Sequence, residues 1–182
     1  MKITVLNGDP GDGQSALGEF LEELGLRLSA SGHELKPVRL AGLNVKRCTG
    51  CWGCWVKTPG ECVIRDDMAG VLRSVINAEL LVFASPVVMG LTSATLKRAT
   101  DRLLPLLHPY IELVNGACRH RRRYAHSPLL GLVLERSQAD SEDLEIVREI
   151  YGEIAADFRS ELRFTRFADE NPQEVAGEID RL

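Results

Sequence analysis

The chain has 182 residues, is 45% hydrophobic and 26% charged, and carries a formal net charge of -4 with a pI near 5.6. These values suit one globular domain spanning residues 1–182, whereas a nucleic-acid-binding protein would show a basic face and a membrane protein would need an apolar run of about 20 residues. Met1-Lys2 leads directly into a strand pattern without a signal peptide's apolar block, so we expect a cytoplasmic protein with reduced cysteines.

The first third of the chain has the pattern of a strand, a loop, a helix and a second strand. Residues 2–6 are rich in β-branched and aliphatic residues and end in the turn-forming sequence NGDPGDGQS. Apolar residues at helical spacing then predict a helix over about 15–30. The strand expected over 33–40 alternates apolar and polar residues and contains Pro37, which favours an edge of the sheet.

The remaining chain continues the alternation of helices and strands. We expect a cysteine-rich loop over 48–65, helices over 67–77, 92–107 and 139–158, strands over 80–84, 129–134 and 161–167, and a short last helix within 172–182. Ser85-Pro86 is expected to end the strand over 80–84. Residues 108–127 fit no single period and exceed the usual connection length, so we interpret them as an arm, lid or subunit contact.

Five strand and helix pairs in succession predict an α/β fold with a parallel sheet and right-handed crossovers. The second and fifth strands alternate like edge strands, while the third and fourth are almost wholly apolar, as interior strands are. This pattern predicts a flavodoxin-like three-layer sandwich whose five-stranded parallel sheet has the order 2-1-3-4-5. In such folds the ligand lies beyond the carboxyl ends of the strands.

The loop after the first strand is a candidate phosphate site. Gly8, Gly11 and Gly13 precede a helix N-terminus, where free N–H groups and the helix dipole favour an anion. The spacing is neither a P-loop nor the Rossmann G-x-G-x-x-G, which disfavours nucleoside triphosphates and a typical NAD site. Asp9 and Asp12 add negative charge there, and a tight turn without a ligand is the alternative.

Four of the five cysteines follow the pattern C-x2-C-x2-C-x7-C, at Cys48, Cys51, Cys54 and Cys62. Four thiolates from one loop are a ligand set for a [4Fe-4S] cluster, and they would also satisfy tetrahedral zinc. Zinc sites more often use paired C-x2-C units, which this triplet does not provide. Free, structural or redox-active thiols are the third interpretation.

Two segments carry a resemblance to a known family. Residues 85–97, SPVVMGLTSATLK, with Asp101-Arg102, resemble the S-P-V-Y-x-G-x-x-S-A-x-L-K…D-R signature of the NADPH-dependent FMN reductases. Residues 48–68 are similar to the C-x-G-C-x-x-C…G-x-C-x-I-x-D-D-M segment of their multimeric relatives and of the iron-sulfur flavoproteins. The likeness covers most of residues 1–135.

The resemblance implies FMN at the strand ends, NAD(P)H as electron donor and a homodimer or homotetramer. The phosphate loop would comprise Gly8, Pro10, Gly13, Gln14 and Ser15. The isoalloxazine segment would comprise Ser85, Pro86, Val87, Val88 and Gly90. A [4Fe-4S] cluster would be bound by Cys48, Cys51, Cys54 and Cys62.

Three positions depart from the family pattern. The G-S-P-R of the family is Gly8-Asp9-Pro10-Gly11 here, which removes a hydroxyl and an arginine that would bind phosphate. The aromatic residue of S-P-V-Y is Val88. The main hypothesis, which follows from the resemblance, is an FMN-binding oxidoreductase that passes electrons from NAD(P)H or an electron carrier to an unidentified acceptor. The alternative, which the departures at Asp9, Gly11 and Val88 favour, is a non-enzymatic flavodoxin-like module with a degenerate flavin site and a redox- or metal-sensing cysteine loop.

Overall fold

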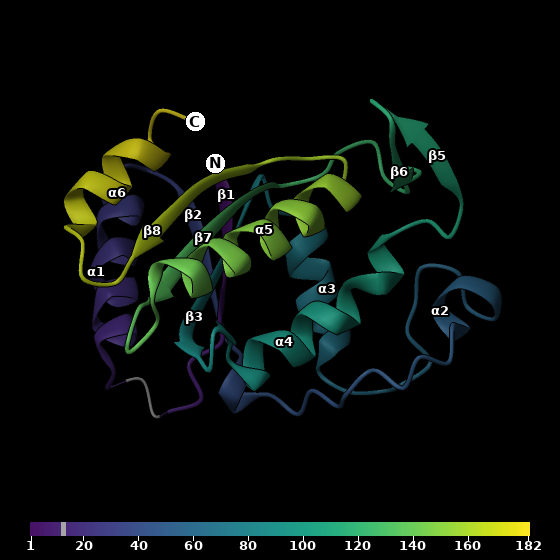
Figure 1. Ribbon diagram of the computed structural model, residues 1–182, viewed down its shortest axis with the longest axis horizontal. Coiled ribbons are helices and arrows are strands. Elements are labelled where there is room, and N and C mark those ends of the chain that lie inside the picture. Colours follow the sequence, from purple (N-terminus) through teal and green to yellow (C-terminus); the bar gives the residue numbers. More distant parts are fainter. Residues whose placement is uncertain (12–13) are drawn as a thin grey trace.

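The computed structural model describes residues 1–11 and 14–182. A twisted sheet forms the middle layer; α1 and α6 cover one face, and α3, α4 and α5 cover the other (Figure 1). The helices are α1 (Ala16–Ala30), α2 (Gly53–Val56), α3 (Met68–Ile76), α4 (Ala94–Thr100), α5 (Ser141–Asp157) and α6 (Pro172–Ile179), with 3₁₀ turns η1 (Leu40–Gly42) and η2 (Asp101–Leu106).

The parallel strands have the order β2-β1-β3-β7-β8, which confirms the predicted order 2-1-3-4-5. The strands are β1 (Lys2–Asn7), β2 (Glu34–Arg39), β3 (Leu80–Val88), β4 (Leu91–Thr92), β5 (Ile111–Val114), β6 (Ala117–His120), β7 (Leu129–Glu135) and β8 (Leu162–Phe167).

The central strand β3 is covered on both faces, which explains its nearly continuous apolar sequence. Leu80 and Val82 pack against α1 and α6, whereas Leu81 and Phe83 pack with α3, α4 and α5. Successive side chains of a strand point to opposite faces, so each face receives alternate residues. No described helix is long and apolar enough to span a lipid bilayer.

The prediction that Ser85-Pro86 ends the third strand is wrong, because β3 continues to Val88. Strand β1 accompanies β3 only as far as Ala84, so Pro86 has a parallel neighbour on the β7 side alone. Proline has no N–H to donate, so it is tolerated in a strand where one side has no hydrogen-bonded neighbour. The extension pairs antiparallel with β4, so the sheet has a sixth strand that the sequence pattern did not predict.

The helix expected over 92–107 is shorter than predicted. It is regular over α4 and continues as the 3₁₀ turn η2, which contains Pro105. Proline cannot donate the i→i−4 hydrogen bond, and its ring clashes with the preceding turn of an α-helix. The tighter 3₁₀ geometry accommodates it.

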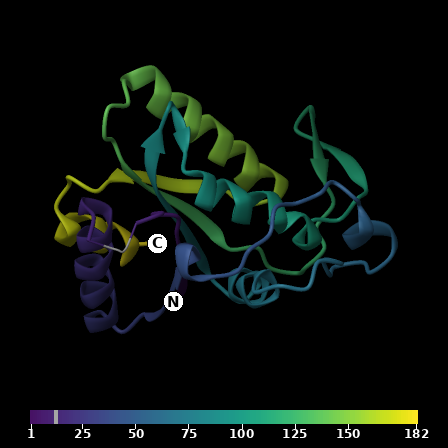
Figure 2. The same ribbon diagram turned by 90° about the horizontal axis from the view of Figure 1, so that it is seen from below.

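The segment over 108–127 contains the hairpin of β5 and β6. Its turn is Asn115-Gly116, and both residues have the positive φ angles of a type I′ turn. The hairpin and α2 extend together to one side of the sheet (Figure 2). The two segments that fitted no regular pattern in the sequence are therefore neighbours in the fold.

Candidate functional site

The predicted phosphate loop and isoalloxazine segment follow two neighbouring strands, β1 and β3. The backbone N–H of Gly8 donates to the carbonyl of Ala84 at 2.8 Å, and the Ser93 hydroxyl donates to the carbonyl of Gly8 at 2.5 Å. The Ser85 hydroxyl oxygen accepts from the N–H of Ser93 at 2.8 Å. These bonds fix both segments at the same edge of the sheet, where parallel α/β folds bind their ligands.

Gly8 is required by packing against α4. An added Cβ would lie 2.4 Å from the Cβ of Leu96 and 3.1 Å from the carbonyl oxygen of Ala84. We expect Gly8→Ala to lower the free energy of unfolding by about 1–3 kcal/mol, the usual cost of overpacking. Urea unfolding measures this loss. Gly70→Ala in α3 is the control, because nothing lies within 4 Å of its added Cβ; an equal loss in both variants would contradict the packing argument.

The carboxylate of Asp9 lies inside the phosphate loop, and the residue is only 5% exposed. Its Oδ1 accepts from the N–H of Gly11 at 2.9 Å, and its Oδ2 accepts from the Ser15 hydroxyl at 2.5 Å. Ser15 is also the N-cap of α1 and accepts from the N–H of Gly18 at 3.0 Å. The donors of Gly11 and Ser15 therefore face a carboxylate of the chain itself.

The other predicted phosphate-loop residues differ in position. Pro10 is exposed and borders a cavity of about 150 Å³, together with Thr95 and Arg98. Gln14 is exposed, and Gly13 lies outside the described residues.

The isoalloxazine segment is the end of β3 and the turn that follows it. Ser85 and Val87 are buried, and the Ser85 hydroxyl donates to the carbonyl of Pro86 at 2.8 Å. Val88 is half-exposed. Met89 and Gly90 form the turn into β4 with positive φ angles, and Met89 is 97% exposed. Pro86, Val88 and the turn are therefore the parts of this segment that a ligand could touch.

The cysteine loop presents its four thiols in different environments. Cys54 is buried, Cys51 is exposed, and Cys48 and Cys62 are partly exposed. Burial raises the pKa of Cys54, and the nearby charges of Cys62, Cys48 and Cys51 raise it further. Hydrogen bonds from the Gly53 backbone and the Thr49 side chain lower the pKa of Cys51.

The four thiols therefore share one neighbourhood. Among the described residues, however, no three His, Cys, Asp or Glu side chains are gathered closely enough to hold a metal ion. The loop has the donor chemistry of a cluster site without the convergent geometry.

A buried ion pair anchors this loop to the fold. Arg102 donates to both carboxylate oxygens of Asp66, at 2.8 and 3.0 Å, and the side chains are 1% and 0% exposed. Arg102 also donates to the carbonyl of Lys46 at 2.7 Å. Asp66 accepts in addition from the N–H groups of Lys46 and Met68, at 2.9 and 3.1 Å. The pair therefore joins η2 to the residues at both ends of the cysteine loop.

The Cys62 side chain is a second neighbour of the Arg102 guanidinium. Burial by itself would lower the pKa of Arg102, but hydrogen bonds and charge interactions with Asp66 and Cys62 raise it. The Nε atom of Arg102 is the one buried side-chain nitrogen or oxygen without a hydrogen-bond partner in the described part of the chain.

The ion pair predicts sensitivity to acid. Burial alone would raise the pKa of Asp66, but hydrogen bonds from Arg102, Lys46 and Met68 lower it below its ordinary value. A depressed folded-state pKa contributes stability that is complete above about pH 4 and is lost as the pH falls toward the folded-state value.

We therefore expect the unfolding midpoint in urea to fall between about pH 6 and pH 3. In Asp66→Asn the fall should be smaller, because the titrating group is gone. Equal pH dependence in both proteins would contradict this role.

Aromatic rings connect the cysteine loop to the hairpin and to η2. The rings of Trp52 and Trp55 are 4.8 Å apart, and Trp55 lies 5.5 Å from the ring of His120 on β6. The indole N–H of Trp55 donates to the carbonyl of Leu104 at 3.1 Å. Trp55 is therefore a structural link, whereas Trp52 remains half-exposed.

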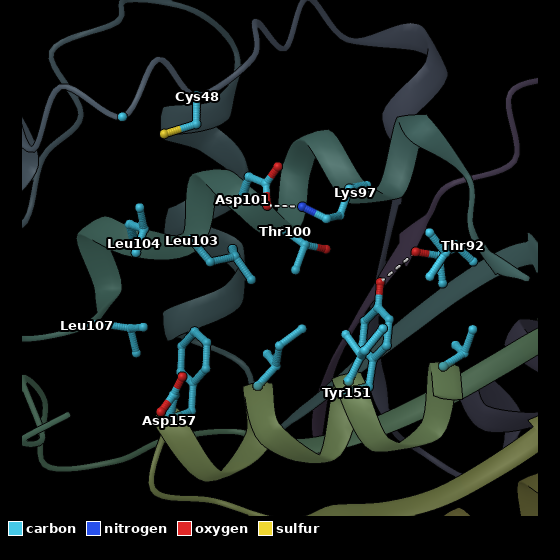
Figure 3. Close-up of a pocket in the computed structure, with 16 residues that line it drawn as sticks. Cys48, Thr92, Lys97, Thr100, Asp101, Leu103, Leu104, Leu107, Tyr151 and Asp157 are labelled. Carbon is cyan, nitrogen blue, oxygen red and sulfur yellow. Dashed lines mark hydrogen bonds and ion pairs between the residues drawn. The ribbon is translucent and has the colours of Figure 1, made fainter. Parts of the chain in front are cut away.

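A cavity of about 550 Å³ lies between η2 and α5 and reaches the cysteine loop (Figure 3). Its walls are mainly apolar, with Leu103 and Leu104 on one side and Tyr151 on the other. Cys48 of the cysteine loop lines one end of the cavity. The Tyr151 hydroxyl lies 3.3 Å from the Thr92 hydroxyl, and burial raises the pKa of Tyr151. The cavity thus runs from β4, next to the isoalloxazine segment, to the first cysteine.

Three features of this region were not predicted from the sequence. The Asp66–Arg102 pair joins residues 36 positions apart, and no local pattern reveals such a contact. The cavity depends on helix packing. The internal ligation of Asp9 could have been suspected, because aspartate commonly accepts from a backbone N–H two residues on.

The family model described as NADPH-dependent FMN reductase matches residues 1–144. An iron-sulfur flavoprotein of Archaeoglobus fulgidus is 36% identical over 111 residues, which are 59% of this chain and 48% of that protein. The curated relatives that the chain matches are all named iron-sulfur flavoproteins, and the alignments cover 48–59% of their length. The chain thus spans about half the length of these relatives.

Solved structures show the same fold. An NAD(P)H:quinone oxidoreductase from Methanothermobacter marburgensis has a TM-score of 0.64 at 15% identity, covering 100% of this chain and 92% of that one. An FMN-dependent NADH-azoreductase from Bacillus anthracis, in complex with FMN, has a TM-score of 0.62 at 12% identity, covering 99% and 94%.

Proposed function

The chain belongs to the NADPH-dependent FMN reductase family, and from this premise we propose that it is a flavin-dependent oxidoreductase that carries electrons from NAD(P)H to an acceptor. The family match over residues 1–144 is the observation that carries the proposal. FMN is the flavin that the family name gives. When bound, a flavin accepts a hydride from a reduced nicotinamide and passes its electrons on.

The chain's part in this function is binding and orientation. Pro86, Val88 and the Met89-Gly90 turn would offer an apolar flank to the flavin ring, since they are the accessible parts of the isoalloxazine segment. The hydrogen bonds of Gly8 and Ser93 hold this flank against the phosphate loop. The N–H of Gly11 and the hydroxyl of Ser15 do not fit the flavin's phosphate as they stand, because the Asp9 carboxylate accepts from both.

The cysteine loop is proposed to hold a [4Fe-4S] cluster through Cys48, Cys51, Cys54 and Cys62. Support comes from the four thiols of one loop and from the names of the curated relatives. The thiols would have to move together, because they do not form a metal site in the described arrangement. Arg102, next to Cys62, would offset part of the thiolates' negative charge.

The acceptor and the assembly are also proposals. We assign a small-molecule acceptor to the cavity beside Tyr151, because its apolar walls lie between the isoalloxazine segment and Cys48. We expect a homodimer or homotetramer. Its support is a set of exposed apolar side chains on the β3–β4 turn and on α5, namely Val88, Met89, Leu91, Ile146 and Ile150.

The absorption spectrum of anaerobically purified protein tests the proposed function. A flavin-dependent oxidoreductase shows resolved visible bands of oxidised flavin, either as purified or after incubation with flavin. A non-enzymatic module with a degenerate site shows none. Absence of flavin bands after incubation with both FMN and riboflavin would contradict the proposal.

A further inference from the structure

We propose that Asp9 takes the place of the flavin's phosphate in the loop after β1, so that this chain binds riboflavin at least as tightly as FMN. The inference rests on the proposed flavin-dependent function and adds a specificity to it. Its starting point is the buried carboxylate of Asp9, which accepts hydrogen bonds from Gly11 and Ser15.

These hydrogen bonds are of the type that an anionic ligand would need. A backbone N–H in a glycine-rich loop and an N-cap hydroxyl at a helix N-terminus are typical phosphate donors. Among the described residues, no Lys, Arg or His nitrogen lies within 4.0 Å of the Asp9 carboxylate. The carboxylate is therefore held by the anion-binding groups of the loop and not by a cation.

A second carboxylate accepts a hydrogen bond from a backbone N–H in the first turn of α1. Glu135, at the end of β7, accepts from the N–H of Leu17 at 3.3 Å. The N–H groups of Gly18 and Glu19 donate to the side chain and the carbonyl of Ser15. The N–H groups of Leu17, Gly18 and Glu19 are thus satisfied by groups of the chain, and one of these groups, the Glu135 carboxylate, carries negative charge.

Two arginines lie near this loop, and Arg98, which shares a cavity with Pro10, donates to the carbonyl of Val45. Arg39, at the end of β2, donates to the carbonyl of Gly11. The hydrogen bonds of both arginines are therefore directed at neutral backbone oxygens.

A phosphate at this position would meet both an occupied donor set and a like charge. A phosphate monoester carries about -1.5 to -2 charges at neutral pH, and like charges in a partly buried site repel strongly. Riboflavin has the same ring and ribityl chain as FMN but ends in a neutral hydroxyl, so it avoids this repulsion. Asp9 is therefore a specificity-determining residue for the flavin's end group.

Flavin fluorescence titration of the unloaded full chain tests the proposal with two probes, FMN and riboflavin. The wild-type protein is expected to bind riboflavin at least as tightly as FMN. Asp9→Ser frees the donors and removes the charge, and it should raise the affinity for FMN relative to riboflavin at least about tenfold. Asp9→Asn keeps the side-chain shape and should shift the ratio in the same direction by less.

Glu142→Gln is the matched control. Glu142 is an exposed carboxylate on α5 at the same edge of the sheet, so its removal changes the local charge without touching α1. Its ratio of FMN to riboflavin affinity should equal that of the wild type. Circular dichroism checks that each variant folds. If Asp9→Ser does not fold, the ratios of FMN to riboflavin affinity of the wild type and of Asp9→Asn test the proposal.

Either of two results overturns the inference while leaving flavin binding intact. The first is a wild-type protein that binds FMN more tightly than riboflavin. The second is a ratio of FMN to riboflavin affinity that neither Asp9 substitution changes. If no variant binds either flavin, the proposed function fails, and the inference fails with it.

Discussion

Replacing Arg102 by methionine is expected to lower the free energy of unfolding by about 3–5 kcal/mol, because the substitution leaves the buried carboxylate of Asp66 without its cation. The side chain of Asp66 is fully buried and accepts two hydrogen bonds from Arg102. Methionine fills a similar volume, so most of the loss comes from the unpaired charge. Equilibrium unfolding in urea measures it.

Arg98→Met, in the helix α4 that precedes η2, is the matched control. Arg98 is only partly buried and makes one long hydrogen bond, at 3.3 Å, to the carbonyl of Val45. Its loss should stay below about 1 kcal/mol. In the double variant Asp66→Asn with Arg102→Met, the total loss should be smaller than the sum of the single losses, because neither charge is left alone. Equal losses in the two arginine variants would contradict the role of the ion pair.

Replacing Cys54 by serine is expected to abolish iron loading of the cysteine loop. Cys54 is the buried thiol of the four, and the charges of the other three already affect its pKa. A [4Fe-4S] cluster needs all four thiolate ligands, and serine is a poor substitute for a buried thiolate. The measurement is iron and sulfide content after anaerobic reconstitution.

Cys118→Ser is the control for that experiment. Cys118 is an exposed thiol on β6, outside the cysteine loop. Its variant should load as much iron as the wild type. Full loading of the Cys54 variant would contradict the proposed ligand set, and a wild-type chain that loads no iron would remove the cluster from the proposal without affecting the flavin.

The order of the sheet could be predicted because strand burial is visible in the sequence. The continuous apolar run of β3 and the alternation in β8 distinguish interior strands from edge strands. The β5–β6 hairpin could also have been found, since Asn115-Gly116 is a typical turn signal. The full length of β3 could not be predicted, because Pro86 is tolerated there only since the pairing of β3 with β1 ends at Ala84.

The candidate site was predicted as a set of loops but not as a set of contacts. The sequence places Asp9 and Ser15 in one loop, yet only the fold shows that their side chains are bonded to each other. Glu135 reaches the same helix from a strand 118 positions away. Contacts of this kind follow from tertiary packing, on which local patterns carry no information.

Anaerobic reduction of the flavin-loaded protein by NADH and by NADPH tests the central claim most directly. The protein is loaded with whichever of FMN and riboflavin binds, mixed with each nicotinamide in turn and followed by absorption. A flavin-dependent oxidoreductase predicts that the visible band of the oxidised flavin is lost with at least one donor and returns on exposure to an oxidant. A bound flavin that stays oxidised with an excess of both donors would contradict the proposed function.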